Sequence, residues 1–291
     1  MRVGLTFDFG SRFLAQGTAS GNTPREGAEE TLAAVCSALS DAGHDAVLIG
    51  DVSDLVDKLA AGDRWDLVFN LCEGTIGRGA SGQIPALLEA YGIPFTFADI
   101  TSRCIAENAP TLKSVLVEVG VAVAEESDSP GREFTVCIVG HGSASEVLGV
   151  LECASVLDVM LSDRDAESTD APTLAQIADT SDPEVMQAQR LALSAWQAVG
   201  GCDAGEVDLQ LDESGSLQVV DVKLLPDLYP VDSAFSTIAD AAGISYGSLI
   251  QRIIDEAQSR GQSAKSSADR KSPARPHFHA TTRLKAVNLK A

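Results

Sequence analysis

The sequence has few histidines, few aromatic residues and no paired cysteine motif. Four histidines occur in 291 residues, and aromatic residues make up 5% of the chain. His44 and His141 each stand without a serine, cysteine or acidic partner at a recognisable spacing, which argues against a catalytic histidine. His277 and His279 form an i, i+2 pair to which we assign no function. The six cysteines are far apart, so we interpret them as reduced packing residues.

Long apolar runs and basic charge are also scarce. No run approaches the roughly 20 apolar residues of a membrane span, and Arg2 and Asp8 interrupt the N-terminus before a signal-peptide core can form, so we expect a cytoplasmic protein. The first 260 residues hold 14 basic and 41 acidic residues, a net charge of −27 that should repel nucleic acid and membranes. Residues 261–291 are polar, aperiodic and rich in Lys and Arg, which predicts a disordered basic tail.

The first hundred residues alternate between short apolar runs and amphipathic segments. The apolar runs predict strands at Arg2–Phe7, Ala46–Ile49 and Leu67–Asn70, with another beginning at Pro94–Thr96. The helical periodicity predicts helices from Pro24 to Leu39, over Val52–Ala61 and over Gln83–Tyr91. Such an order favours an open, mainly parallel α/β unit whose ligand-facing loops follow the carboxyl ends of the strands.

One of these loops, residues 71–82, is rich in glycine. It reads L-C-E-G-T-I-G-R-G-A-S-G and contains Glu73 and Arg78. Glycine lets backbone N–H groups approach an anion, but a flexible turn has the same composition. Both interpretations stay open.

A charged hairpin is expected over Glu206–Asp227. Apolar residues alternate with period two on both sides of D-E-S-G at 212–215, which predicts two antiparallel strands. A loop of two or four residues places Asp208, Asp221 and Lys223 on one face, with Glu206 beside Asp221. Carboxylates so placed suit Mg²⁺, although the lysine can supply the positive charge instead. The hairpin is therefore either a former metal site closed by a salt bridge or a set of solvated polar positions.

The middle of the chain carries less information. Glu146–Glu152 predicts a strand, and Leu157–Pro183 is an acidic surface connection with a short helix expected near Leu174. Apolar residues recur at helical spacing from Pro183 to Val199, where two glycines end the helix. We expect this helix to belong to the core.

Several stretches resemble the D-alanine:D-alanine ligase-like members of the ATP-grasp family. They are W-D-L-V-F-N-L-C-E-G, Q-I-P-A-L-L-E-A-Y-G-I-P-F-T-F, P-G-R-E-F-T-V and A-G-I-S-Y-G-S-L-I-Q-R-I. The resemblance implies an N-terminal α/β (pre-ATP-grasp) domain over residues 1–100 and an ATP-grasp α+β domain over 101–260, before the tail at 261–291. It also implies chemistry in which ATP phosphorylates a carboxylate and an amine displaces the phosphate, with Mg²⁺ screening the phosphoryl oxygens.

The nucleotide side of the resemblance is incomplete. Ala109 stands where the family has a lysine that reaches the nucleotide phosphates. Glu125 and Glu126 match the hinge that holds the nucleotide, yet the segment after Gly120 runs almost directly into them. We therefore expect an incomplete ATP-grasp domain that lacks the small nucleotide-clamping subdomain. Glu73 falls in the loop that faces the substrate in the family.

The hairpin positions depart further from the family pattern. Glu206 and Asp227 occupy positions that stabilise the oxyanion in the family, through an arginine side chain and a glycine N–H, and both bring negative charge instead. Asp208 matches a metal ligand, and Asp221 replaces a glutamate. Lys223 takes the place of an asparagine ligand, and it can only donate hydrogen bonds.

Three functions remain open from the sequence. The first is a non-catalytic binding or regulatory module that pairs with itself or with an intact ligase through the N-terminal domain, and that needs no cofactor. The second is an active ATP- and Mg²⁺-dependent carboxylate–amine ligase with a shortened site. The third is a damaged gene product. The resemblance implies a small amino acid or dipeptide as the ligand.

Overall fold

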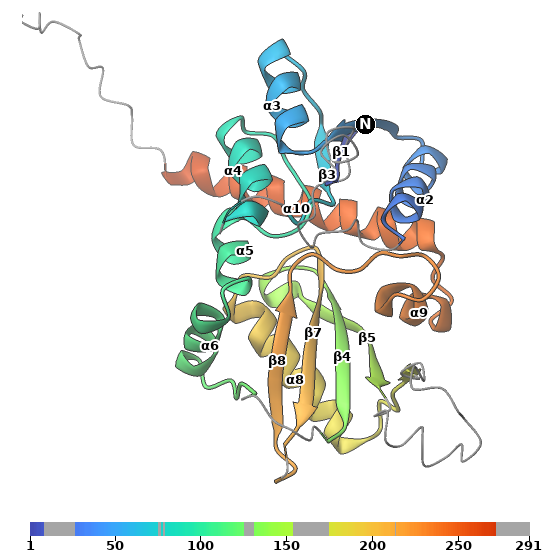
Figure 1. Cartoon of the computed structure of the whole chain (residues 1–291), viewed down its shortest axis with the longest axis vertical. Coiled ribbons are helices and arrows are strands. Elements are labelled where there is room, and N and C mark those ends of the chain that lie inside the picture. Colours follow the sequence, from blue (N-terminus) through green and yellow to red (C-terminus); the bar gives the residue numbers. More distant parts are fainter. Residues whose placement is uncertain are drawn as a thin grey trace, which may run out of the picture.

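A computed structural model describes residues 1–8, 27–74, 77, 79–124, 131–153, 175–212 and 214–271, the last ten of these by their backbone alone. The chain forms a small parallel sheet with its helices and a larger antiparallel sheet below it (Figure 1). No helix in these ranges combines the length and the apolar character needed to cross a membrane. The hinge positions Glu125 and Glu126 lie outside the described residues.

The N-terminal unit is built on three parallel strands. They are β1 (Arg2–Thr6), β2 (Asp45–Gly50) and β3 (Leu67–Asn70), in the order β2-β1-β3. All four residues of β3 are buried, as expected for a parallel strand covered on both faces. This confirms the predicted parallel α/β unit. The expected strand at Pro94–Thr96 is reduced to a single parallel bridge between Phe95 and Val68.

Three helices accompany these strands, namely α2 (Ala28–Asp41), α3 (Val52–Ala61) and α4 (Gln83–Ala90). The bounds of α3 agree with the prediction because local signals define them. Asp51 caps its first turn in a capping box, and Gly62 ends it with φ +96°. Helix α2 begins at Ala28 rather than at Pro24, which lies outside the described residues.

The second sheet is antiparallel. Its strands are β4 (Glu133–Val139), β5 (Glu146–Cys153), β6 (Ala175–Ile177), β7 (Ala204–Leu211) and β8 (Leu217–Lys223), in the order β6-β5-β4-β7-β8. Residues 154–174, which include the short helix expected near Leu174, lie outside the described residues, and β6 begins directly after them. Helix α8 (Pro183–Ala198) packs against β4, β7 and β8, and its Trp196 is fully buried in that core. The prediction of a core helix is confirmed.

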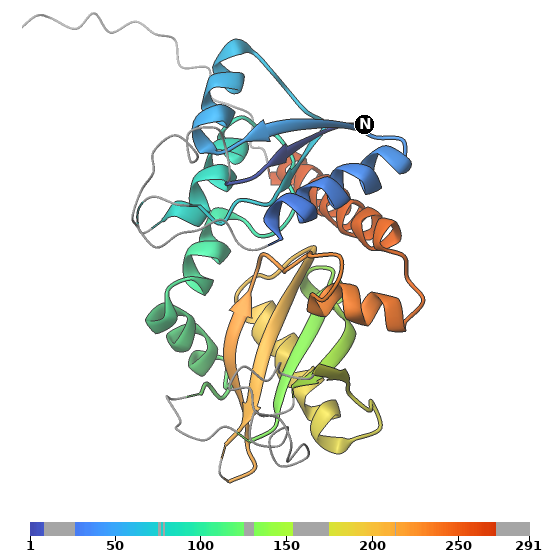
Figure 2. The ribbon, with the colours of Figure 1, turned by 45° about the vertical axis from the view of Figure 1, so that its right-hand side comes forward.

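Two helices, α5 (Ile100–Ala106) and α6 (Ala109–Glu118), link the units along one side of the molecule (Figure 2). After α6 the chain lies beside β8, where Ala124 N donates to Val219 O. Gly131 N already bonds to Leu211 O, the last residue of β7. Six residues, 125–130, connect these two points.

The last two helices pack on different units. Helix α9 (Ala234–Ala241) packs on β4 and β5, and α10 (Tyr246–Lys271) packs on α2. Short 3₁₀ turns lie at η1 (Ala80–Gly82) and η2 (Gly142–Ala144). Because α10 continues past Gly261 to Lys271, the segment predicted to be a disordered tail begins as a helix. Residues 272–291 lie outside the described residues.

Candidate functional site

The loop of the β7–β8 hairpin is longer than the sequence suggested. Leu211 pairs with Leu217, which leaves five residues in the loop instead of two or four. Asp212 fastens this loop, because its Oδ1 accepts hydrogen bonds from the N–H groups of Ser214 and Ser216 at 2.8 and 2.9 Å. An odd number of loop residues reverses the faces of the second strand relative to an even number.

A bulge in β8 restores the expected face. Counted from the five-residue loop, an unbroken ladder would point Asp221 away from Asp208. The ladder instead skips Val220, so that Asp221 lies opposite Asp208 and Lys223 lies opposite Glu206. The four side chains therefore share a face as predicted, but Glu206 lies opposite Lys223 and not beside Asp221.

The ammonium group of Lys223 lies among the carboxylates of β7. Its Nζ is 2.7 Å from Asp208 Oδ2 and 3.6 Å from Glu206 Oε2. The other oxygen of Asp208 accepts a hydrogen bond from Thr135 Oγ1 at 2.8 Å. Asp221 Oδ1 accepts from the N–H of Val222 at 2.8 Å. These contacts support the interpretation in which a salt bridge closes the cluster.

Burial and charge set the protonation of this cluster. Burial raises the pKa of Glu206 to about 7, although the nearby Lys223 opposes the change. Burial also raises the pKa of Asp221. For Lys223, burial lowers the pKa, but Asp208 and Glu206 outweigh it and the net change is upward. Lys223 is thus a cation at neutral pH, and Glu206 takes up a proton near pH 7.

The backbone of Asp227 is turned toward Glu206. Its N–H donates to Glu206 Oε1 at 3.3 Å, and its own Oδ1 accepts from the N–H of Tyr229 at 3.0 Å. This N–H is the group that we expected to face a developing oxyanion. Here it already has a buried carboxyl group as its acceptor.

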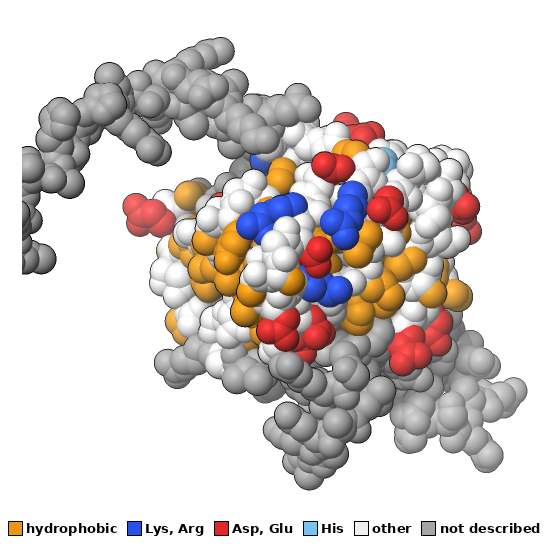
Figure 3. Space-filling model, turned by 90° about the horizontal axis from the view of Figure 1, so that it is seen from above, with side chains coloured by type: hydrophobic (Ala, Val, Ile, Leu, Met, Phe, Trp, Pro, Cys, Tyr) orange, Lys and Arg blue, Asp and Glu red, His pale blue; other side chains and the backbone are white. Residues whose placement is uncertain are grey.

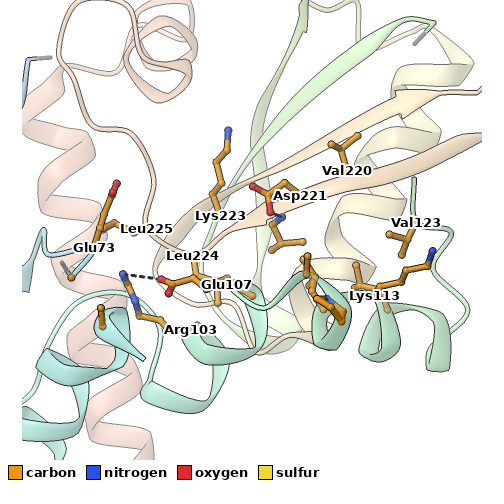
Figure 4. Close-up of a pocket in the computed structure, with 18 of the residues that line it drawn as sticks. Glu73, Arg103, Glu107, Lys113, Val123, Val220, Asp221, Lys223, Leu224 and Leu225 are labelled. Atoms are coloured by element: carbon orange, nitrogen blue, oxygen red, sulfur yellow. Dashed lines mark hydrogen bonds and ion pairs between the residues drawn. The ribbon is translucent and has the colours of Figure 1, made fainter. Parts of the chain in front are cut away.

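A cavity of about 930 Å³ opens between the N-terminal unit and β8. Glu73, Arg103 and Glu107 approach from the N-terminal side, and Asp221 and Lys223 from β8 (Figure 4). The remaining wall is mostly apolar and includes Ala109, Leu112, Leu116, Val222, Leu224 and Leu225. Three predicted residues, Glu206, Asp208 and Asp227, do not line this cavity. The predicted residues Glu73, Asp221 and Lys223 therefore line the cavity, and the other members of the charge cluster lie outside its wall.

Arg103 is a cavity residue that the sequence reasoning missed. It lies on α5 with 3% of its surface exposed, and Nη2 donates to the carbonyl of Cys72 at 3.1 Å. Glu107 Oε1 is 3.7 Å from the same nitrogen. Burial lowers the pKa of Arg103, while Glu107 opposes that change. The available signal was an arginine in the first helix after Asp99, where the neighbouring residues are apolar or small.

The side chains of the charged hairpin do not offer the oxygen ligands that Mg²⁺ needs. This ion requires about six oxygen ligands at about 2.1 Å, and the ammonium of Lys223 already bonds the oxygen that Asp208 would offer. Within the described ranges, no three His, Cys, Asp or Glu side chains are grouped to hold a metal ion. Ala109 lines the cavity with a methyl group, which cannot neutralise a phosphate.

The chain is similar to D-alanine–D-alanine ligases in sequence. The enzyme of Xanthomonas axonopodis pv. citri is 24% identical over 283 positions, which include 76% of this chain and 87% of the relative. Ligase B of Mesorhizobium japonicum is 26% identical, with 77% and 91% covered. The alignment has 283 positions, and 76% of the 291 residues of this chain fill only part of them. At the remaining positions the Xanthomonas relative has residues without a counterpart in this chain.

Structure and family comparison agree with this similarity. The D-alanine–D-alanine ligase of Bacillus anthracis complexed with ATP matches with a TM-score of 0.70 at 17% identity, covering 91% of this chain and 99% of that chain. At this identity the match shows a shared ATP-grasp fold. Residues 106–255 match the family model described as D-ala D-ala ligase C-terminus. Since this segment spans more than half of the chain and includes the charged hairpin, the chain belongs to the D-alanine–D-alanine ligase family.

Proposed function

We propose that this chain is a catalytically degenerate ligase homologue that acts as a non-catalytic binding or regulatory module. The contact between Lys223 and Asp208, 2.7 Å long, carries this proposal. A lysine side chain has no lone pair to offer a metal while it is protonated. It therefore places one positive charge in the cluster but cannot serve as a ligand of Mg²⁺.

The surroundings of the cluster support the same conclusion. Loss of one oxyanion donor costs about 2.7 to 4 kcal/mol of transition-state stabilisation. Here the N–H of Asp227 bonds to Glu206, and the carboxyl group of Glu206 stands where a cation would be needed. Ala109 and the six-residue connection at 125–130 leave no phosphate-binding lysine or lid subdomain at these positions. Several losses of this size together exceed what a slow enzyme tolerates.

An active ligase with a shortened site is the alternative. The pairing of Asp208 with Asp221 favours it, because two carboxylates remain opposite each other on the face that the family uses. For this alternative, Mg²⁺ must displace the ammonium of Lys223 from Asp208. Binding of ATP–Mg²⁺ is therefore the step that separates the two functions.

Calorimetric titration of the full chain with ATP and Mg²⁺ tests the proposal. We expect no saturable heat at millimolar nucleotide, while an intact D-alanine–D-alanine ligase measured in parallel binds. ATP without Mg²⁺ controls for nonspecific binding of the nucleotide. A saturable, Mg²⁺-dependent heat would favour the active ligase.

A repaired variant separates the metal site from the missing subdomain. Lys223→Asn with Asp221→Glu restores an oxygen ligand and frees Asp208, so we expect a Mg²⁺-dependent rise in melting temperature. We expect no phosphate release from ATP, because the connection at 125–130 cannot cover the γ-phosphate. Phosphate release above that of the unmodified chain would contradict the importance given to the missing subdomain.

A regulatory module needs a partner, and we propose pairing through the N-terminal unit. Leu48, Val56 and Tyr91 of this unit each have 45 to 50% of their surface exposed. Figure 3 looks onto this end of the molecule, where apolar side chains lie among charges of both signs. Sedimentation at low and physiological salt, with and without an intact ligase, tests this proposal. Because the acidic chain repels itself, association should strengthen with salt.

A further inference from the structure

The cavity contains a buried cation whose hydrogen-bonding groups are incompletely used. Arg103 is 3% exposed, and Nη2 donates to Cys72 O. Within the described residues, neither Nε nor Nη1 has a hydrogen-bond partner. A buried donor without an acceptor costs about 1 to 3 kcal/mol. A guanidinium group in this state is suited to receive an acceptor from a ligand.

A second arginine shows what a structural guanidinium looks like in this chain. Arg260 donates to both carboxylate oxygens of Asp203 at 2.9 and 3.2 Å. It also donates to the carbonyl oxygens of Phe95 and Phe97 at 2.8 and 3.0 Å. Arg260 thereby joins α10 to both units. Among the described residues, Arg103 makes a single hydrogen bond to the rest of the protein, from Nη2 to the carbonyl of Cys72. A structural role therefore does not account for the burial of its guanidinium group.

The charges around the cavity are balanced and do not exclude an anion with a single charge. The described residues of the wall include three acidic and three basic side chains, namely Glu73, Glu107 and Asp221, and Arg103, Lys113 and Lys223. The cavity is thus locally balanced in a chain whose net charge is −21. A monoanion meets little repulsion there, whereas a phosphate dianion would require further cations. The apolar wall formed by Leu112, Leu116 and Leu224 suits a short hydrocarbon body.

We propose that Arg103 binds the carboxylate of a small monocarboxylic acid in this cavity, without nucleotide or metal. This inference deepens the proposed binding role and rests on it. Figure 4 shows the guanidinium group reaching from α5 toward Glu73 and Glu107. The carboxylate accepts from the unused N–H groups, and the hydrocarbon body lies against the leucines. Glu107, whose side chain is 47% exposed, competes with the ligand for the same guanidinium.

Titration of the full chain with sodium butyrate, followed by two-dimensional NMR, tests the site. We expect saturable shifts of amide signals from α5 and β8 in the absence of ATP and Mg²⁺. Arg103→Gln should weaken butyrate binding about tenfold or more, because a charged hydrogen bond contributes about 1.5 to 3 kcal/mol. Arg190→Gln, which removes an exposed arginine of α8, is the charge-matched control and should bind as the unmodified chain does.

Glu107→Gln provides an independent test with the opposite sign. Removal of the competing carboxylate should strengthen butyrate binding about two- to fivefold, since exposed pairs contribute up to about 1 kcal/mol. This variant also decides the question if Arg103→Gln fails to fold. Unchanged or weaker binding in Glu107→Gln would overturn the proposal, as would equal binding by Arg103→Gln and the unmodified chain.

Two further probes define the ligand class. Inorganic phosphate should bind more weakly than butyrate, and butylamine should not bind at the same amide signals. Tighter binding of phosphate, binding of butylamine at those signals, or non-saturable shifts with butyrate would each overturn the carboxylate assignment. Because no nucleotide is present, such a failure leaves the non-catalytic proposal intact. Conversely, ATP–Mg²⁺ binding alongside butyrate binding would overturn the non-catalytic role alone.

Discussion

Glu206→Gln should change how the stability of this protein depends on pH. Glu206 is 3% exposed, and burial raises its pKa from an ordinary 4.5 to about 7. Between these values the folded protein keeps a proton that the unfolded chain has released. The free energy of unfolding therefore falls as pH rises through this window and levels off above about pH 7. The difference between the two pKa values corresponds to about 3 kcal/mol.

Glutamine keeps the shape of the side chain and can still accept from the N–H of Asp227. It has no carboxyl group to ionise, so the variant should gain stability relative to the unmodified chain by up to about 3 kcal/mol from pH 4.5 to pH 8. Urea denaturation at pH 4.5, 6, 7 and 8 measures this difference. Glu89→Gln, at an exposed position in α4, is the control and should give a difference close to zero at every pH.

A constant difference between Glu206→Gln and the unmodified chain across these pH values would refute the reasoning. It would mean that the carboxyl group of Glu206 has the same protonation in both states, so that Lys223 fully compensates its burial. Greater destabilisation of the variant at pH 8 than at pH 4.5 would refute it as well. Either outcome would remove the argument that the cluster is neutralised partly by a proton.

Two further substitutions test how the units are held together. Arg260→Met should destabilise the protein by about 3 to 5 kcal/mol in thermal denaturation, because it leaves the fully buried carboxylate of Asp203 without its cation. The control Arg252→Met, which removes a partly exposed ion pair, should cost under about 1 kcal/mol. Gly205→Ala should cost about 1 to 3 kcal/mol, since its Cβ would lie 2.3 Å from a buried indole ring, and Gly247→Ala, which meets nothing within 4 Å, should be neutral or stabilising. Equal losses of stability in Arg260→Met and Arg252→Met would contradict the role of the buried ion pair. Equal effects of Gly205→Ala and Gly247→Ala would contradict the steric argument.

Local signals in the sequence were sufficient for much of the fold. The helix at Val52–Ala61 and the strand at Leu67–Asn70 have the predicted bounds, because capping residues and apolar runs lie within the elements themselves. The strands of the charged hairpin were also predicted, and with them the common face of Asp208, Asp221 and Lys223. Period-two alternation encodes which residues share a face.

The pairing within that face was decided by tertiary structure. The sequence predicted an even loop and a regular ladder, and the protein has a five-residue loop compensated by a bulge at Val220. The longer loop and the bulge compensate each other, so each side chain stays on the predicted face of the sheet. The partner opposite Glu206, however, becomes Lys223 instead of Asp221. A regular hairpin with an even loop and a hairpin with a five-residue loop and a bulge differ little in local free energy. Packing of both strands on the core therefore selects the register.

Arg103 shows the same limit of prediction from sequence at the cavity. Its sequence neighbours predict a helix, but they do not reveal that its guanidinium would be buried beside Cys72, 31 residues earlier in the chain. That contact arises where α5 meets the loop after β3, and the cavity exists because β8 approaches from the other unit. Residue types determined the helices, strands and charge of this protein. Contacts between segments distant in sequence decided which charges meet, because burial and pairing depend on neighbours that only the folded chain supplies.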